Sequence, residues 1–222
     1  MIVQALTLTL RLAVIVSLIL LVVGVPLAYW LAFSRMRWKF FVEAIVSLPI
    51  VLPPTVLGFY LLVALGPRSF IGRWWMAFTG EGLVFSFSGL VVASLLLNLP
   101  FFVQPLASAM AGVEGRYLEA AATLGAGPAA RVWRVALPLA WRGLVSGAVL
   151  SFAHTMGEFG VVLMVGGDLP GRTRTASIAV FDQVQALDLA GAHRTALFLI
   201  ILAFGVLTAV ALLKGARRSW SF

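Results

Sequence analysis

Five apolar runs divide this chain, and each is long enough to cross a lipid bilayer as a helix. They cover approximately residues 8–33, 44–65, 83–111, 144–165 and 195–213. A hydrocarbon core about 30 Å thick takes about 20 helical residues to cross. Because unpaired backbone groups are costly in lipid, such runs are restricted to helices. The expected fold is one all-α integral membrane domain over residues 1–222, with about five transmembrane helices.

The composition leaves no room for a separate soluble domain. Hydrophobic residues make up 62% of the chain and charged residues 11%, against about 25% charged residues in soluble domains. The first run has no basic segment before it and is longer than the apolar part of a signal peptide, so we expect it to be retained as a membrane helix. Because the sequence has no cysteine, disulfides, thiolate metal sites and cysteine nucleophiles are excluded.

The sequence carries a net charge of +8, but its basic residues are spread over the short segments between the apolar runs. This pattern is typical of membrane orientation rather than of a groove for nucleic acid. The basic residues expected on the cytoplasmic side are Arg35, Arg37, Lys39, Arg116, Arg131, Arg134, Arg142, Lys214, Arg217 and Arg218. Those expected outside are Arg11, Arg68, Arg73, Arg172, Arg174 and Arg194. This bias places the N-terminus outside and the C-terminus in the cytoplasm.

A polar segment at about residues 112–142 separates the third apolar run from the fourth. Its alanines at 120–122 are strong helix formers, whereas Gly125 and Gly127 are natural positions for a helix to end. The sequence therefore predicts a short helix that stops near Gly125.

A second short helix is expected to follow. Pro128 suits its first turn, the helix would extend to Arg134, and Pro138 is expected to end it. Together the two helices would form a rigid projection joined at a glycine corner. The alternative is an amphipathic loop on the lipid surface, with Arg131 and Arg134 facing phosphates.

The second apolar run contains Pro49, Pro53 and Pro54, each of which removes a backbone donor and crowds the preceding turn. We expect this helix to be kinked or broken. Irregular backbone at membrane depth is tolerated where it is buried in protein or lines an aqueous cavity. Thr55, just beyond the break, is therefore a candidate for the transport pathway, although a packing kink explains the prolines equally well.

A second interruption is expected in the third run, at Asn98–Pro100, with Gln104 and Pro105 about one turn further on. The two amide side chains should face protein or water. Asn98 is therefore a pathway candidate. The alternative role for Asn98 and Gln104 is hydrogen bonding between helices.

The fourth run carries His154 and Glu158, which are four residues apart and hence on one helical face. A carboxylate at bilayer depth costs on the order of 3 kcal/mol or more, so Glu158 must be paired, facing water or protonated. It is a gate or structural element, or the proton-coupling group of a secondary transporter. A zinc protease site is disfavoured, because the His-Glu-x-x-His pattern is missing and only His193 remains elsewhere.

Several segments resemble a known family. Glu119-Ala120-Ala121, Gly125, Val135 and Leu137-Pro138 have the spacing of the coupling loop of ABC importer permeases, with Val135 where isoleucine is usual. The segments at 48–62, 66–72 and 157–182 resemble the molybdate importer permeases of the binding-protein-dependent transport system inner membrane component family. The resemblance implies a type I importer permease fold in the bacterial inner membrane.

The resemblance also implies partners and residue roles. The partners would be a second copy of the chain, two cytoplasmic ABC ATPases that use ATP and Mg²⁺, and an extracytoplasmic molybdate-binding protein. The ATPase-coupling residues would be Glu119, Ala120, Ala121, Gly125, Leu137 and Pro138. The candidates for a pathway or gate are Pro53, Pro54, Thr55, Asn98 and Glu158, and those facing the binding protein are Arg172 and Arg174. No catalytic residue, metal or cofactor site is expected on this chain.

The function implied by the resemblance is import of molybdate by alternating access. Tungstate, which has a nearly identical size and charge, is expected to follow. One rival is a sulfate or thiosulfate permease, which typically has an additional N-terminal span that is not expected here. The other is a proton-coupled secondary transporter using Glu158, but that function gives no account of the segment at 112–142.

Overall fold

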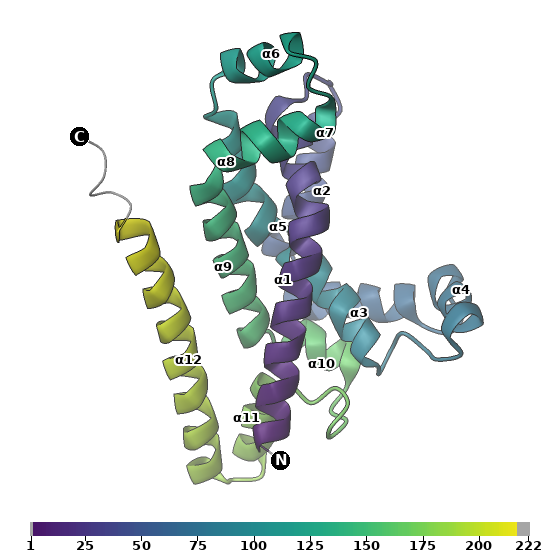
Figure 1. The fold of residues 1–222 in the computed structure, drawn as a ribbon. Coiled ribbons are helices and arrows are strands. Elements are labelled where there is room, and N and C mark those ends of the chain that lie inside the picture. Colours follow the sequence, from purple (N-terminus) through teal and green to yellow (C-terminus); the bar gives the residue numbers. More distant parts are fainter. Residues whose placement is uncertain (1, 217–222) are drawn as a thin grey trace.

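The computed structural model describes residues 2–216, and every regular element in this range is helical. Three long helices form the centre: α1 (Ile2–Phe33), α5 (Phe87–Ala111) and α9 (Trp141–Gly157) pack on one another. A fourth, α12 (Leu189–Ala216), lies beside them and contacts α9 and α11 (Ala176–Gln185) (Figure 1). The expected all-α membrane fold is confirmed.

Shorter helices occupy the two ends and one side of this bundle (Figure 1). They are α2 (Lys39–Val51), α3 (Pro54–Leu65), α4 (Phe70–Thr79), α6 (Gly115–Thr123), α7 (Pro128–Arg131), the π-helix η1 (Val132–Ala136), α8 (Leu137–Leu139) and α10 (Gly160–Gly166). Helices α6 to α8 lie at one end. Helices α10 and α11 lie at the other, beside the start of α1.

The predicted number of spans depends on how two bent helix pairs are counted. Among the described residues, α1, α5 and residues 189–208 of α12 are each long and apolar enough to cross a membrane. Helices α2 and α3 meet at 115°, and the segment Pro128–Leu139 meets α9 at 85°. The predicted count of five is reached if each bent pair is one span. Arg217 and Arg218, which the charge argument used, lie outside the described residues.

The predicted break in the second apolar run is confirmed. Helix α2 ends at Val51, and the chain is extended at Pro53, with φ −55° and ψ 136°. Pro54 then opens α3 at a position where a missing N–H costs nothing. Pro49, by contrast, lies inside α2 without ending it.

The interruption predicted at Asn98–Pro100 is wrong, because α5 is continuous through both Pro100 and Pro105. This helix packs against α1, α9 and α10, so tertiary contacts keep the chain helical where local propensity would end the helix. The Asn98 Nδ2 atom also donates to the Ser94 carbonyl oxygen at 2.8 Å, an extra bond in the turn just before Pro100.

The single helix expected over residues 144–165 is also wrong. Helix α9 ends at Gly157, Glu158 is extended with ψ 132°, and α10 begins at Gly160. Two glycines flanking this point weaken the helix, since glycine has low helix propensity. The carbonyl oxygen of Glu158, left free by the break, accepts a hydrogen bond from the Ser177 hydroxyl of α11.

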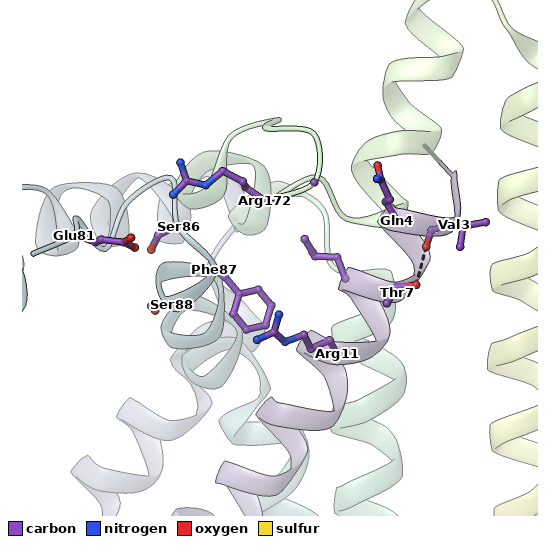
Figure 2. A pocket seen from close by; sticks show the side chains of 11 residues that line it. Val3, Gln4, Thr7, Arg11, Glu81, Ser86, Phe87, Ser88 and Arg172 are labelled. Carbon is purple, nitrogen blue, oxygen red and sulfur yellow. Dashed lines mark hydrogen bonds between the residues drawn. The ribbon is translucent and has the colours of Figure 1, made fainter. Parts of the chain in front are cut away.

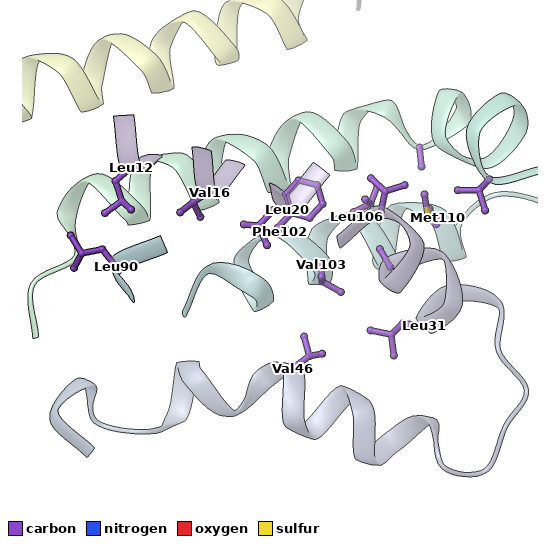
Figure 3. Packing of buried hydrophobic residues seen from close by; sticks show 14 of the residues in the cluster. Leu12, Val16, Leu20, Leu31, Val46, Leu90, Phe102, Val103, Leu106 and Met110 are labelled. Atoms are coloured by element: carbon purple, nitrogen blue, oxygen red, sulfur yellow. The ribbon is translucent and has the colours of Figure 1, made fainter. Parts of the chain in front are cut away.

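The central helices α1, α5 and α9 pack closely on one another and so position the shorter helices at the two ends of the bundle. Fully buried Leu12, Val16 and Leu20 of α1 lie in one cluster with Phe102 and Leu106 of α5 (Figure 3). Helix α9 approaches α5 through Gly147, where an added Cβ would lie only 2.5 Å from the Phe102 carbonyl oxygen. The bundle is thus tightly packed around α5.

Candidate functional site

The first candidate surface lies at the α6 end of the bundle. Helix α6 ends at a glycine corner: Gly125 has φ +83°, in the left-handed region. Its N–H donates to the Ala122 carbonyl at 3.0 Å, and the Ala126 N–H donates to the Ala121 carbonyl at 2.9 Å. This pair of bonds is the Schellman arrangement that ends helices. The helix end predicted near Gly125 is therefore confirmed.

The second short helix begins at Pro128 as predicted but runs further than expected. Residues Val132–Ala136 form a π-helix, and the helical path continues through Pro138 to Leu139 before turning into α9 at Ala140. The end predicted at Pro138 is wrong. In the π-turn the Leu137 N–H donates to the Val132 carbonyl, five residues back instead of four. The backbone hydrogen bonds have therefore already left the α-helical pattern before Pro138, which has no N–H to donate.

The predicted coupling residues lie on these two short helices and their corner. Glu119, Ala120, Gly125 and Pro138 are exposed, and Ala121 and Leu137 are partly buried. Helix α6 contacts α7 and η1, so both helices belong to one surface. We call residues 115–139 the α6–α8 surface.

The sequence-based prediction missed the apolar side chains of the α6–α8 surface. Leu124 is 88% exposed, Trp133 49% and Tyr117 44%. Leu118 and Val132 are buried and hold the surface to the bundle. Large apolar side chains projecting from a polar segment are typical of an interface with another protein. Their positions on the two short helices, away from the buried Leu118 and Val132, were the sequence signal that could have identified these exposed apolar side chains.

A second candidate site is a buried polar cluster at the break between α9 and α10. The Glu158 side chain is only 4% exposed. The Ser94 hydroxyl donates to its Oε2 atom and the Asn98 Nδ2 atom donates to its Oε1 atom, both at 2.6 Å. Both donors come from α5. Two of the pathway candidates, Asn98 and Glu158, are thus in direct contact through a hydrogen bond.

His154, to which the sequence analysis assigned no role, completes this cluster. Its Nδ1 atom lies 3.0 Å from Asn98 Oδ1 and 3.5 Å from Glu158 Oε1. Its ring stacks on Phe101 of α5 with centroids 4.1 Å apart. The arrangement favours the structural interpretation of Glu158, which joins α9 to α5.

The remaining pathway candidates lie at the break between α2 and α3. Pro53, Pro54 and Thr55 are exposed at the start of α3. The start of α3 lies against α10, because a Cβ added to Gly160 would be 3.0 Å from the Pro54 Cβ atom. Two broken helices therefore meet near Glu158. Among the described residues, no group of three or more His, Cys, Asp or Glu side chains could hold a metal ion.

Gln104 forms a hydrogen bond between helices, the alternative role that the sequence analysis gave for it. Its Nε2 atom donates to the Ser47 hydroxyl at 2.9 Å and so links α5 to α2.

The two arginines predicted to face a binding protein differ in their surroundings. Arg172 is exposed and lines a pocket. Arg174 is paired with Asp168 through two hydrogen bonds, one of them 2.8 Å from Nη2 to Oδ2, and its Nη1 lies 3.3 Å from Asp182 Oδ2. The hydrogen bonds to Asp168 raise the pKa of Arg174, so its charge is permanent. This guanidinium holds the loop to α11.

Replacing Arg174 by glutamine should lower the stability of this loop only moderately. Arg174 is 20% exposed, and its partners Asp168 and Asp182 are 30% and 48% exposed, so water screens the pairs and the loss should be about 1 kcal/mol. We expect the melting temperature in detergent without added lipid to fall by about 2–4 °C. Arg172→Gln is the matched control and should leave it unchanged. Equal effects of the two changes would contradict this role.

Comparisons with known proteins agree over most of the chain. A sequence model of the family described as binding-protein-dependent transport system inner membrane component matches residues 24–216. The molybdenum transport system permease protein ModB of Azotobacter vinelandii is 51% identical, over 93% of this chain and 91% of that protein. ModB of Escherichia coli strain K12 is 35% identical, over 82% of this chain and 80% of that protein.

Solved structures show the same fold at lower identity. The chain matches a structure of the MetNI methionine ABC transporter in inward-facing conformations with a TM-score of 0.72 and 19% identity, over 97% of this chain and 95% of that one. It matches a bacterial ABC transporter involved in the import of alginate with a TM-score of 0.75 and 14% identity, over 99% of this chain and 80% of that one.

Proposed function

Because the chain belongs to the binding-protein-dependent transport system inner membrane component family, we propose that it carries molybdate across the membrane as the permease subunit of an ABC importer. The observation that carries the choice of substrate is the 51% identity to the molybdenum permease of Azotobacter vinelandii over nearly the full length of both chains. The α6–α8 surface supports the importer role. Its glycine corner and exposed apolar side chains suit docking to another protein.

The partners follow from the same proposal. Two cytoplasmic ATPase subunits dock on the α6–α8 surface and use ATP and Mg²⁺, while this chain carries no ATPase site of its own. A molybdate-binding protein docks at the opposite end, and a second copy of the chain completes the pathway. The exposure of Leu124 and Trp133 on the α6–α8 surface is consistent with such docking.

The proposed orientation places the α6–α8 surface in the cytoplasm. The basic loop between α1 and α2 lies at the same end of the molecule, and α10 and α11 lie at the other (Figure 1). Basic loops favour the cytoplasmic side. The start of α1 is then outside, in the inner membrane of a bacterium.

Transport of a dianion restricts what can line the pathway. A fixed carboxylate in the path would repel molybdate, whereas neutral donors and positive potential at the mouths favour it. Glu158 points into its own hydrogen-bond donors on α5 and is nearly fully buried, which supports a role in holding the helices rather than in touching the substrate. Alternating access would then move helices around this fixed cluster.

The two rival functions receive less support. The two ModB proteins that share 51% and 35% of their residues with this chain are molybdenum permeases, which favours molybdate over sulfate or thiosulfate. A proton-coupled transporter would need Glu158 to exchange protons with water, whereas three side chains enclose its carboxylate.

Uptake of labelled molybdate tests the proposal. Cells that lack the gene should lose uptake at limiting molybdate, and the gene should restore it. Restored uptake should resist excess sulfate and be competed by tungstate. Unchanged molybdate uptake together with impaired sulfate uptake would reject molybdate in favour of sulfate. Uptake driven by a pH gradient without the ATPase would reject the importer.

A further inference from the structure

A pocket opens at the end of the bundle opposite the α6–α8 surface. It has a volume of about 470 Å³ and lies between the start of α1, the start of α5 and the loop before α11. Figure 2 shows its polar lining: Gln4, Thr7 and Arg11 from α1, Glu81, Ser86 and Ser88 from the α4–α5 segment, and Arg172 from the loop. Pockets of this size accommodate small molecules or headgroups.

Two arginines give the pocket its charge. The Arg11 guanidinium lies 4.7 Å from the centre of the Phe87 ring, which holds it against α5. Arg172 is exposed on the loop and lines the same pocket. Within residues 2–216, neither guanidinium has a carboxylate within salt-bridge distance. Guanidinium groups prefer planar or tetrahedral oxyanions, to which they donate two hydrogen bonds at once.

The polar residues of α1 form a stripe that faces this pocket. Gln4, Thr7, Leu8 and Arg11 are spaced three, four and seven residues apart, so they share one helical face, and all four line the pocket. An arginine inside an otherwise apolar membrane helix is costly unless it has a partner or reaches the interface. The stripe therefore marks a polar face on the first part of α1.

The length of α1 places Arg11 at the depth of lipid headgroups. Its 32 residues span about 48 Å, and Ser34 and Arg35 follow its last residue, Phe33. Roughly the last 20 residues of α1 are enough to cross the hydrocarbon core, and this stretch begins just after Arg11. The pocket thus lies beside the phosphate layer of the membrane.

The carboxylate of Glu81 limits the charge that the pocket can hold. It lies at the α4 side of the pocket and reduces the net charge of the lining from two to one (Figure 2). One excess positive charge suits a phosphodiester, which carries a single negative charge, better than a dianion.

We propose that this pocket binds a phosphate group through Arg11 and Arg172, and that its natural source is the phosphodiester of an outer-leaflet phospholipid. The hydroxyls of Thr7 and Ser88 line the same space and supply further hydrogen bonds. A lipid bound there joins α1, α5 and the loop before α11, three segments far apart in the sequence. The proposal is independent of the transported substrate, because it requires neither ATP nor uptake.

The test is a thermal unfolding assay on the full permease with its ATPase, purified in detergent and stripped of lipid. The probes are dihexanoylphosphatidylglycerol, dihexanoylglycerol with the same tails but no phosphate, and inorganic phosphate. A ligand that binds the folded state raises the melting temperature in a saturable way. We expect the phospholipid to do so and dihexanoylglycerol not to do so.

Variants identify the site. Arg11→Gln/Arg172→Gln should weaken the apparent affinity for the phospholipid at least about tenfold, roughly the loss of one or two charge-assisted hydrogen bonds. Arg172→Gln alone, in an exposed loop, should weaken it less and still fold. Arg194→Gln is the matched control: within residues 2–216 this exposed arginine of α12 bonds only to its own helix, at the Ala190 carbonyl. The change should leave the response intact.

The probes also separate the two sources of the phosphate group. Stabilisation by the phospholipid alone identifies the lipid, and stabilisation by inorganic phosphate as well identifies a site that takes free oxyanions too, provided that both depend on Arg11 and Arg172. Equal stabilisation by dihexanoylglycerol, or an unchanged response in the double variant, overturns the proposal.

Discussion

Replacing Gly125 by valine should reduce ATP-driven molybdate uptake by about tenfold or more while the subunit still inserts into the membrane. Gly125 has φ +83°, a conformation that costs most L-residues about 1–2 kcal/mol and β-branched ones more. No atom lies within 4 Å of a Cβ added there, so the effect arises from the backbone and not from a clash. The corner would reopen, and the α6–α8 surface would no longer fit the proposed ATPase partner.

The matched control for this change lies two residues away. Gly127 is equally open but has φ −66°, a value that any residue adopts. Gly127→Ala should therefore retain uptake, and Gly125→Asn should retain more than Gly125→Val, because asparagine tolerates the left-handed region. The measurements are uptake and ATP hydrolysis in proteoliposomes that contain the complete importer. Normal uptake by Gly125→Val would count against a coupling role for this corner.

Replacing Glu158 by leucine should destabilise the protein by about 3 kcal/mol or more. The change leaves the Ser94 hydroxyl, the Asn98 amide and the His154 ring without the carboxylate that they surround. Leaving a buried donor without its acceptor typically costs about 1–3 kcal/mol, and two donors on α5 lose theirs here. We expect a large fall in the melting temperature and in the amount of folded protein in the membrane.

Glu158→Gln separates a structural role from proton coupling. Glutamine keeps the shape and one acceptor oxygen for Asn98, so we expect most of the stability and of the ATP-driven uptake to remain. A proton-coupling carboxylate would instead lose all coupled transport on this change. Glu43→Gln, in the exposed pair between Lys39 and Glu43, is the control and should have almost no effect.

Asn98 offers an independent check on the same cluster. Asn98→Ala and Glu158→Ala should cost less together than the sum of the two single changes, because they remove the same hydrogen bond. Strict additivity would mean that this bond contributes nothing to stability.

Local signals predicted those features that depend on neighbouring residues. The apolar runs predicted the membrane helices because their length must match the bilayer. Gly125 and Pro128 predicted the corner between α6 and α7, since a left-handed residue and a first-turn proline are properties of single positions. The pair Pro53 and Pro54 predicted the break before α3 for the same reason.

Predictions failed where distant contacts override local preference. Pro100 and Pro105 should interrupt a helix, but α5 remains continuous because α1, α9 and α10 pack around it. The opposite error occurred after Gly157, where the run is apolar enough for a helix but the chain extends at Glu158. In both cases the deciding partners are far away in the sequence.

The sequence by itself determined the class of this protein, its membrane helices and the corner at Gly125, because hydrophobic length and backbone conformation are local properties. Only the tertiary structure decided what the polar residues do. Glu158 is satisfied by Ser94 and Asn98, which are 64 and 60 residues away. Arg174 is held by Asp168 and Asp182, whereas Arg172 faces an open pocket. The role of a polar side chain in a membrane protein depends on the group that pairs with it, and residues distant in the sequence become partners only when the chain folds.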